Sequence, residues 1–195
     1  MSADDEPGDR DDGPGDRDTE REDGDGERGK RGGDPIPAAV SERRTPEDTA
    51  LLVDDMLGKL STYLRMCGYD ATYTTDRGVD TDEDVFALAH TEDRLVVTRD
   101  TDLARRADRA VLLSAREVDG QLRELRDAGF ELSLAEEPAR CSACNGLLEG
   151  VDRTEPTPDY APDPHEKTVW RCRECGQHFW RGSHWDDVTA TLSSL

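Results

Sequence analysis

Short apolar runs alternate with amphipathic segments between residues 49 and 138. Short, mostly apolar runs predict strands at 51–53, 71–73, 95–98 and 110–113, the first of them buried. Between them, helical spacing of apolar residues predicts helices over 57–67, 82–89 and 118–128, with a short helical turn through Leu103. Gly68 and Gly129 follow two of these helices, as residues that end a helix often do. This alternation predicts an α/β fold with a parallel sheet and helices on both faces.

The two ends of the chain differ from this central block. Residues 1–34 contain only two hydrophobic side chains, too few to offset the entropy of ordering the chain. We therefore expect a disordered acidic tail over 1–48, the α/β core over 49–138 and a cysteine-containing module over 139–195. A solvated tail is the simpler interpretation, and a protein partner that binds through the tail is the alternative.

Cysteines define the module at the C-terminal end. They form two close pairs with 27 residues between them, Cys141-x-x-Cys144 and Cys172-x-x-Cys175. Two C-x-x-C turns supply the four thiolates of a closed, structural Zn²⁺ site, and the module is then a zinc ribbon. Gly146 and Gly176 follow the two pairs and are expected to ease the turns. Disulfides are the alternative, but nothing in the sequence suggests secretion.

Charge changes the picture of the surface. The chain has a net charge of −21, with 46 acidic and 25 basic residues. Only three of the basic residues are lysines, Lys30, Lys59 and Lys167. A carboxylate-rich, lysine-poor surface is typical of halophilic proteins, because molar salt screens the repulsion among surface charges. Acidity therefore does not argue against nucleic acid as a partner.

The sequence contains no run of 18 apolar residues, so we expect no membrane span. It also lacks an apolar signal segment near its start, which predicts a cytoplasmic protein.

Aspartates stand where the predicted strands end. Asp54 follows the first strand and Asp100 follows the third. The carboxyl ends of parallel strands share one edge of a sheet, where ligands usually bind. Acids near this edge could hold Mg²⁺ or Mn²⁺, and the candidates are Asp54, Asp82, Asp84, Asp100 and Asp102. With 29 aspartates in the chain, simple capping of helices and strands is the competing explanation.

Three sequence blocks resemble a known family. The first block is Val53-Asp54-Asp55-Met56-Leu57-Gly58-Lys59-Leu60, followed by Leu64 to Asp70. The second block is Arg94-Leu95-Val96-Val97-Thr98-Arg99-Asp100. The third block consists of the two cysteine pairs and the ending Trp180-Arg181-Gly182-Ser183-His184. Together they resemble the Mut-seven C-terminal RNase domain, a PIN-like family, over roughly residues 50–188. The resemblance implies a PIN-like nuclease core with an appended zinc ribbon, a ribonuclease activity and RNA as substrate. It implies a catalytic site of Asp54, Asp82 and Asp100, with Asp84 competing with Asp82 and Asp102 less closely matched.

Basic and aromatic residues are candidates for holding RNA. Lys59, Arg65 and Arg99 lie near the acids in sequence and could contact phosphate, or could instead pair with the surplus carboxylates. In the ribbon, Arg181 and His184 lie among aromatic residues, a mixture that suits base stacking and phosphate contact. Trp170 and Phe179 are expected to form the core of the ribbon.

Other functions fit parts of the sequence. A non-catalytic module that binds RNA or docks a partner would have no reason to concentrate acids. A response-regulator receiver also begins with Val-Asp-Asp, but it needs a lysine after a fifth strand, and none stands there. A PIN-type toxin would usually lack the ribbon.

Overall fold

The computed structural model describes residues 43–135 and 137–195. The expected disordered tail therefore lies, up to residue 42, outside the described residues. Four strands form a parallel sheet: β1 (Ala50–Val53), β2 (Asp70–Tyr73), β3 (Leu95–Thr98) and β4 (Ala110–Leu112). The strand order is β2-β1-β3-β4. All four strands coincide with the predicted ones to within one residue at either end, and the α/β class is confirmed.

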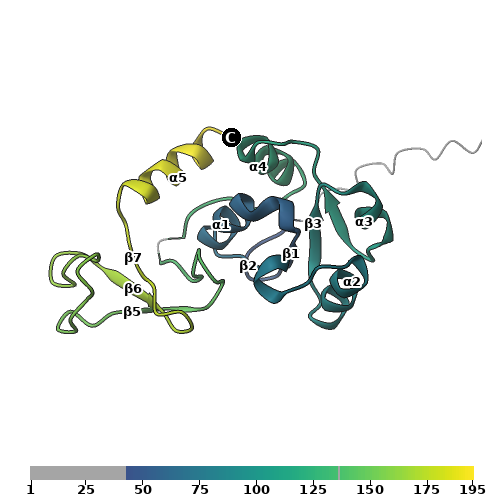
Figure 1. Cartoon of the computed structure of the whole chain (residues 1–195). Helices are drawn as coiled ribbons and strands as arrows, with labels where there is room; N and C mark the ends of the chain where they lie inside the picture. Colours follow the sequence, from purple (N-terminus) through teal and green to yellow (C-terminus); the bar gives the residue numbers. More distant parts are fainter. Residues whose placement is uncertain (1–42, 136) are drawn as a thin grey trace, which may run out of the picture. The chain divides into compact units, whose positions relative to one another are not determined.

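Helices cover both faces of this sheet (Figure 1). They are α1 (Gly58–Met66), α2 (Asp82–Thr91), α3 (Thr101–Arg106) and α4 (Val118–Asp127). Two short 3-10 helices, η1 (Asp55–Leu57) and η2 (Thr74–Arg77), follow β1 and β2. Gly68 and Gly129 adopt positive φ angles of 94° and 89° after α1 and α4, as predicted for residues that end a helix.

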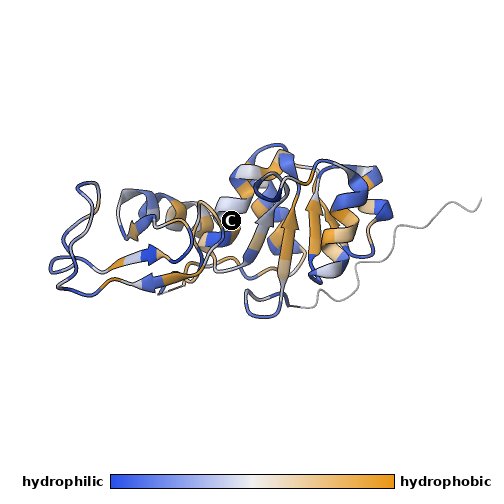
Figure 2. Ribbon diagram, turned by 60° about the horizontal axis from the view of Figure 1, so that its bottom comes forward, coloured by the Kyte–Doolittle hydropathy of each residue, from blue (hydrophilic) through white to orange (hydrophobic). Residues whose placement is uncertain are grey.

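The alternation of side chains along the strands divides the core in two. Leu51 and Val53 of β1 face α1 and α4, whereas Leu52 faces α2 and α3. Figure 2 shows the consequence, with hydrophobic strands inside and hydrophilic outer helix surfaces. Both faces of a parallel sheet are buried in this way because its crossover helices lie on them.

The described fold begins before Thr49. The amide of Arg44 donates to the carbonyl of Gly129 over 2.9 Å, and the amide of Glu131 donates back to Arg44 over 2.9 Å. The buried Tyr69 hydroxyl also donates to the carbonyl of Arg44 over 2.6 Å. Residues 43–48 thus pack on the core, although the expected tail extended to residue 48.

The cysteine-containing module has its own antiparallel sheet of β5 (Leu148–Gly150), β6 (Val169–Cys172) and β7 (His178–Trp180). Trp170 is buried within it, as expected for a core residue. After β7 the chain forms α5 (Ser183–Ser193), which sequence analysis included in the ribbon without predicting a helix. Leu192 and Leu195 pack against the core cluster, and the C-terminus lies beside α4 (Figure 1).

No helix among the described residues is long and apolar enough to cross a membrane.

Candidate functional site

The carboxyl ends of β1 and β3 meet at the point where the strand order of the sheet reverses. Val53 pairs with Val97 in the last register position of β1, and the amide of Asp54 donates to the carbonyl of Val97 over 3.0 Å. Asp54 is therefore next to Thr98 at the end of β3, and Asp100 follows two residues later. In open α/β sheets this reversal point is where ligands bind.

Asp54 is a half-buried carboxylate without a basic partner among the described residues. Its Oδ2 accepts a hydrogen bond from the Thr98 hydroxyl over 2.5 Å, and its Oδ1 accepts one from the amide of Asp55 over 2.8 Å. Burial raises the pKa of Asp54, and the bonds from Thr98 and Asp55 offset only part of that effect. A nearby cation would stabilise the ionised form.

Asp100 is held by the start of the next helix. Its Oδ1 accepts hydrogen bonds from the amides of Leu103 and Asp102, over 3.0 and 2.7 Å, which makes it the N-cap of α3. These two bonds lower the pKa of Asp100. Its own amide donates to the Thr98 hydroxyl over 2.9 Å, so Thr98 contacts both acids.

The other candidate acids have partners elsewhere. Asp82 forms an ion pair of 2.8 Å with Arg106 of α3. Asp84 accepts a hydrogen bond from Thr81, and the amide of Asp84 donates back to that hydroxyl. Thr81 is thus the N-cap of α2, and Asp84 stands in the first turn of that helix. Asp102 is exposed and lies 3.8 Å from Arg105.

The five candidate acids do not form a ready metal cluster. Among residues 43–135 and 137–195, the only group of three or more metal-ligating side chains close enough to share one ion is the four cysteines. The acids that fit a divalent cation best are Asp54 and Asp100, since both offer hard oxygen ligands at one edge, and the half-buried Asp54 has no counter-charge among the described residues. Asp82 and Asp84 are engaged by Arg106 and Thr81.

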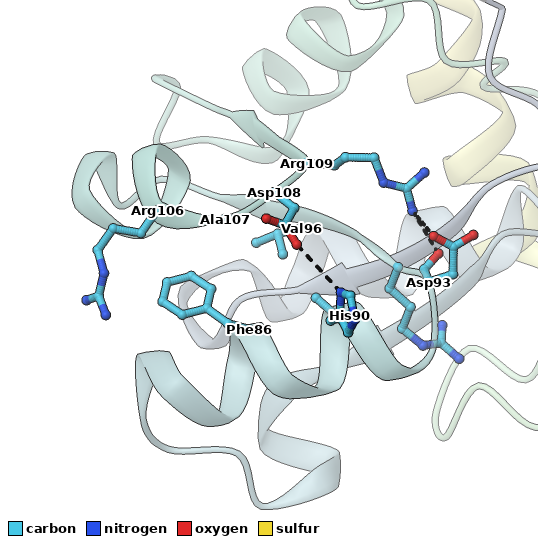
Figure 3. A pocket seen from close by; sticks show the side chains of 10 residues that line it. Phe86, His90, Asp93, Val96, Arg106, Ala107, Asp108 and Arg109 are labelled. Carbon is cyan, nitrogen blue, oxygen red and sulfur yellow. Dashed lines mark hydrogen bonds and ion pairs between the residues drawn. The ribbon is translucent and has the colours of Figure 1, made fainter.

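A separate cavity of about 270 Å³ lies at the amino-terminal ends of the strands, opposite the end with Asp54 and Asp100 (Figure 3). His90 and Asp108 lie 3.6 Å apart on its rim, and Arg109 pairs with Asp93. Because these residues precede the strands β3 and β4, the cavity is remote from Asp54 and Asp100. It does not take part in the candidate acidic site.

Arg65, a candidate phosphate ligand, has a structural role instead. Its side chain is 3% exposed and bonds to the carbonyls of Ala71, Ser142 and Ala143 and to the carboxylate of Asp76. The guanidinium therefore ties α1 and β2 to the first cysteine turn. Of the two expected roles of Arg65, phosphate contact and pairing with a carboxylate, the structure shows the second, with Asp76.

The remaining basic candidates differ in exposure. Lys59 is exposed on α1. Arg99 is partly buried between the two acids in sequence, and its Nε has no hydrogen-bond partner among the described residues. That Nε is itself buried, so Lys59 is the more accessible of the two cations near the acidic edge.

Asp70 forms a connection that sequence analysis did not identify. Its carboxylate pairs with Arg94 over 2.8 Å and Arg140 over 3.2 Å, and accepts a hydrogen bond from Asn145 over 2.8 Å. Burial acts to raise its pKa, but the bonds from Arg94 and Asn145 outweigh burial and lower it. Asn145 also accepts a bond from the amide of Ala71. The sequence shows only that an asparagine, Asn145, follows the first cysteine pair. The contacts of Asn145 with Asp70 and Ala71 become evident only in the folded structure.

The four cysteines converge in the module. The Sγ atoms of Cys141 and Cys175 lie 3.7 Å apart, those of Cys144 and Cys172 lie 3.5 Å apart, and all four lie within 4.8 Å of one another. Four sulfurs around one tetrahedral Zn²⁺ would be separated by about 3.8 Å, so the set fits such an ion. No disulfide joins any of the five cysteines, all of which are described. The cluster could hold a metal ion.

The turns at the cysteines differ from expectation in one detail. Asn145, directly after the first pair, takes the positive φ of 69°, and Gly176 takes the equivalent position after the second pair with φ of 74°. Gly146 is needed for space instead, because a Cβ there would lie 2.9 Å from the sulfur of Cys172. Sequence analysis had assigned the first turn to Gly146.

The last two candidates lie around the start of α5. The guanidinium of Arg181 lies 5.4 Å from the centre of the Trp185 ring. His184 is exposed and borders a small cavity. Among the described residues, neither side chain forms a hydrogen bond or ion pair with the four cysteines or with Asp54 and Asp100.

These features define an α/β domain with two candidate acids at the carboxyl ends of its parallel strands, and a module whose four cysteines could hold a metal ion. The chain belongs to the Mut7-C RNAse domain family, whose model matches residues 49–192. No curated protein and no solved structure matches the chain. The family indicates a nuclease-type function with RNA as substrate.

Proposed function

We propose that this protein is a metal-dependent ribonuclease that hydrolyses RNA phosphodiester bonds at the carboxyl edge of its parallel sheet. The observation that carries the proposal is the pair Asp54 and Asp100, which are joined through the Thr98 hydroxyl where the strand order reverses. Family membership supports the same chemistry. A structural Zn²⁺ in the four-cysteine cluster, and a ribbon that helps to hold RNA, complete the proposal.

Asp54 and Asp100 would hold Mg²⁺ or Mn²⁺, with Asp82 as the third ligand if it exchanges its pairing with Arg106. The bound ion would supply an activated water and stabilise charge that develops on the phosphodiester. The chain's own residues prepare this site. Thr98 fixes the Asp54 carboxylate relative to the backbone of Asp100, and burial keeps bulk water away from one side of Asp54.

The basic side chains nearby have a separate part in the proposal. Lys59 is exposed on α1 beyond β1, and Arg99 is partly exposed directly before Asp100. Either could contact an RNA phosphate next to the acidic edge. Arg181 and His184 would contact RNA at the ribbon.

One observation favours a second candidate, a non-catalytic RNA-binding or partner-docking protein. Asp82 and Asp84 are engaged by Arg106 and Thr81, and the acids do not share one cluster. A receiver-like domain is not favoured, since the described residues contain four strands in the parallel sheet rather than five.

The test is cleavage of end-labelled single-stranded and structured RNA in Mg²⁺ or Mn²⁺, with Asp54→Asn and Asp100→Asn. Asp108→Asn is a matched control, because Asp108 is exposed at the opposite edge of the sheet. We expect divalent-dependent cleavage in the wild type and the control, with a loss of at least about 100-fold in the two site variants. RNA binding without cleavage in any protein would support the second candidate.

A further inference from the structure

A small aromatic cavity lies among the ribbon, α1 and the start of α5. It has a volume of about 120 Å³, and its walls include Met66, Trp170, Phe179, Trp180, His184 and Trp185. We call it the aromatic groove. All three tryptophans of the chain line it.

Packing accounts for only part of this arrangement. Trp170 is 8% exposed and serves as a core residue of the module. Trp180 and Trp185 are only partly buried, yet they border the same cavity. Large aromatic residues that remain partly exposed around a cavity are typical of binding sites rather than of cores.

The groove also has a cationic rim. Arg181 lies over the Trp185 ring and makes no ion pair with the described carboxylates. By contrast, Arg171 and Arg173 on the neighbouring sheet are paired with Glu149. Arg140 lines the wall of the groove and is paired with Asp70 over 3.2 Å. A cation thus remains available beside the aromatic rings.

We propose that the aromatic groove binds one unpaired RNA nucleobase, stacked on Trp180 and Trp185, with Arg181 against the adjoining phosphate. The proposal rests on the proposed function, in which RNA is the substrate. Every base offers a π-face for stacking, and an aromatic surface next to arginine suits single-stranded RNA. An apolar side chain of a protein partner could pack against the aromatic rings but would make no favourable interaction with the guanidinium of Arg181.

The charge of the chain makes such a groove useful. A net charge of −21 opposes the approach of RNA phosphates, so phosphate contacts alone would give weak binding. Stacking does not depend on counterion release, whereas phosphate contacts weaken steeply as salt rises. The stacking part of the RNA affinity should therefore persist in molar KCl, whereas the part due to Arg181 and the phosphate should weaken.

The test uses the full-length, zinc-loaded protein without added Mg²⁺ or Mn²⁺, so that RNA binds without the divalent ion that cleavage would require. Affinity for a short single-stranded RNA is compared with that for a series that carries one abasic site at each position. We expect one position at which the abasic site weakens binding by at least about fivefold. Trp185→Ala should remove that difference, and Trp185→Phe should keep most of it because a ring remains.

Two controls keep the test independent of folding. Far-UV circular dichroism and the metal content check that Trp185→Ala is folded. Arg181→Ala should weaken RNA binding, whereas Arg153→Ala removes the same charge from an exposed loop of the module and should not. The abasic series on the wild type needs no variant at all.

The outcomes separate this proposal from the proposed function. Equal affinity for all abasic RNAs, or unchanged binding by Trp185→Ala, would overturn the groove as a base site even if RNA is cleaved normally. An abasic-sensitive position that depends on Trp185 would support the groove even if cleavage assays fail. A wild type that binds no single-stranded RNA would overturn it, and would favour a protein partner.

Discussion

The hydroxyl of Thr98 donates a hydrogen bond to the carboxylate of Asp54, which is 44 residues earlier in the chain. The same hydroxyl accepts the amide hydrogen of Asp100. Parallel pairing of β1 with β3 brings these groups together, because Val53 and Val97 are register partners. One buried side chain thus sets the relative positions of both candidate catalytic acids.

The first prediction concerns Thr98→Val, which keeps the side-chain shape and removes the hydroxyl. Burial raises the pKa of Asp54 and the Thr98 bond lowers it, so the variant should raise that pKa further. The acidic limb of the pH–rate profile for RNA cleavage should move to higher pH. The amide of Asp100 also loses its acceptor, which should lower the free energy of unfolding by about 1–3 kcal/mol.

Thr98→Ser is the matched control, because it restores the hydroxyl and removes only a methyl group. Its pH–rate profile should stay close to that of the wild type. A Thr98→Val protein with an unchanged acidic limb would show that the Thr98 bond does not tune Asp54.

The second prediction is that Asp54→Asn stabilises the fold at neutral pH while it abolishes cleavage. The folded pKa of Asp54 is raised by burial, so the folded state binds the proton more tightly than the unfolded state. The stability that Asp54 contributes to the fold is therefore fully present below the pKa of Asp54 in the unfolded chain, and it is lost as pH rises through the pKa of Asp54 in the folded protein. Asparagine does not ionise, so the Asp54→Asn variant does not lose this stability as pH rises. The melting temperature of Asp54→Asn should exceed that of the wild type at pH 7, with a difference that shrinks toward pH 4.

Asp100→Asn should behave in the opposite way. Amide bonds from Leu103 and Asp102 lower the pKa of Asp100, so its contribution is present above the unfolded pKa and is lost as pH falls through the folded pKa. Its replacement should not stabilise the protein at pH 7, although Asn remains an acceptable N-cap. Equal effects of the two variants on the melting temperature would contradict the assigned environments.

The third prediction separates Arg65 from Lys59 on the same helix. Arg65→Met leaves the carbonyls of Ala71, Ser142 and Ala143 without their buried donor, which should lower the free energy of unfolding by about 2–4 kcal/mol. Lys59→Met, at an exposed position, should change it by less than about 0.5 kcal/mol. Chemical denaturation measures both. RNA affinity should fall for Lys59→Met, and an unchanged stability of Arg65→Met would refute its structural role.

The hydrophobic pattern predicted the core of the fold because most strands are short, largely apolar runs and the apolar residues of α1, α2 and α4 recur at helical spacing. The helix α5 was missed, although Trp185, Val188 and Leu192 have helical spacing. Its polar Thr and Asp residues and its position after the cysteines made it resemble the ribbon. The contacts of Arg65, Asp70 and Asn145 could not be predicted, since they join segments more than 70 residues apart only after folding.

The acidic site shows the same limit. The strand-end positions of Asp54 and Asp100 follow from sequence, because a strand end is local information. Whether Asp82 or Asp84 reaches the same edge depends on the path of α2 and on the partners Arg106 and Thr81. Sequence alone offers no distance for such a choice.

The fourth prediction concerns the four cysteines. We expect one Zn²⁺ per chain by elemental analysis, and none after Cys141→Ser. A structural zinc ion commonly contributes on the order of 10 kcal/mol to small modules, so loss of the ion should unfold the β5–β7 sheet. All three tryptophans lie at positions 170, 180 and 185, so their fluorescence reports on this part of the chain alone.

Strong chelation should therefore shift tryptophan emission to longer wavelength while the far-UV signal of the core largely persists. Cys67→Ser is the control, because Cys67 lies in the core cluster, away from the four-cysteine set. It should keep the zinc content. A native protein without zinc, or with a disulfide between the pairs, would refute the metal assignment.

The last prediction treats the acidic surface and the N-terminal residues together. Residues 1–42 hold fifteen acidic and six basic residues, so residues 43–195 keep a net charge of −12. If this surface is a salt adaptation, folding should require roughly molar KCl, because the Debye length grows from about 3 Å to about 10 Å on dilution to 0.1 M.

Deletion of residues 1–42 should leave that salt requirement and RNA cleavage unchanged. Deletion of residues 1–48 should in addition lower stability, since it removes the pairing of Arg44 with Gly129 and Glu131. Thermal melts across a KCl series and the cleavage assay measure these outcomes. Full stability of the shorter deletion at 0.1 M KCl would exclude the salt adaptation, whereas loss of cleavage would assign a function to residues 1–42.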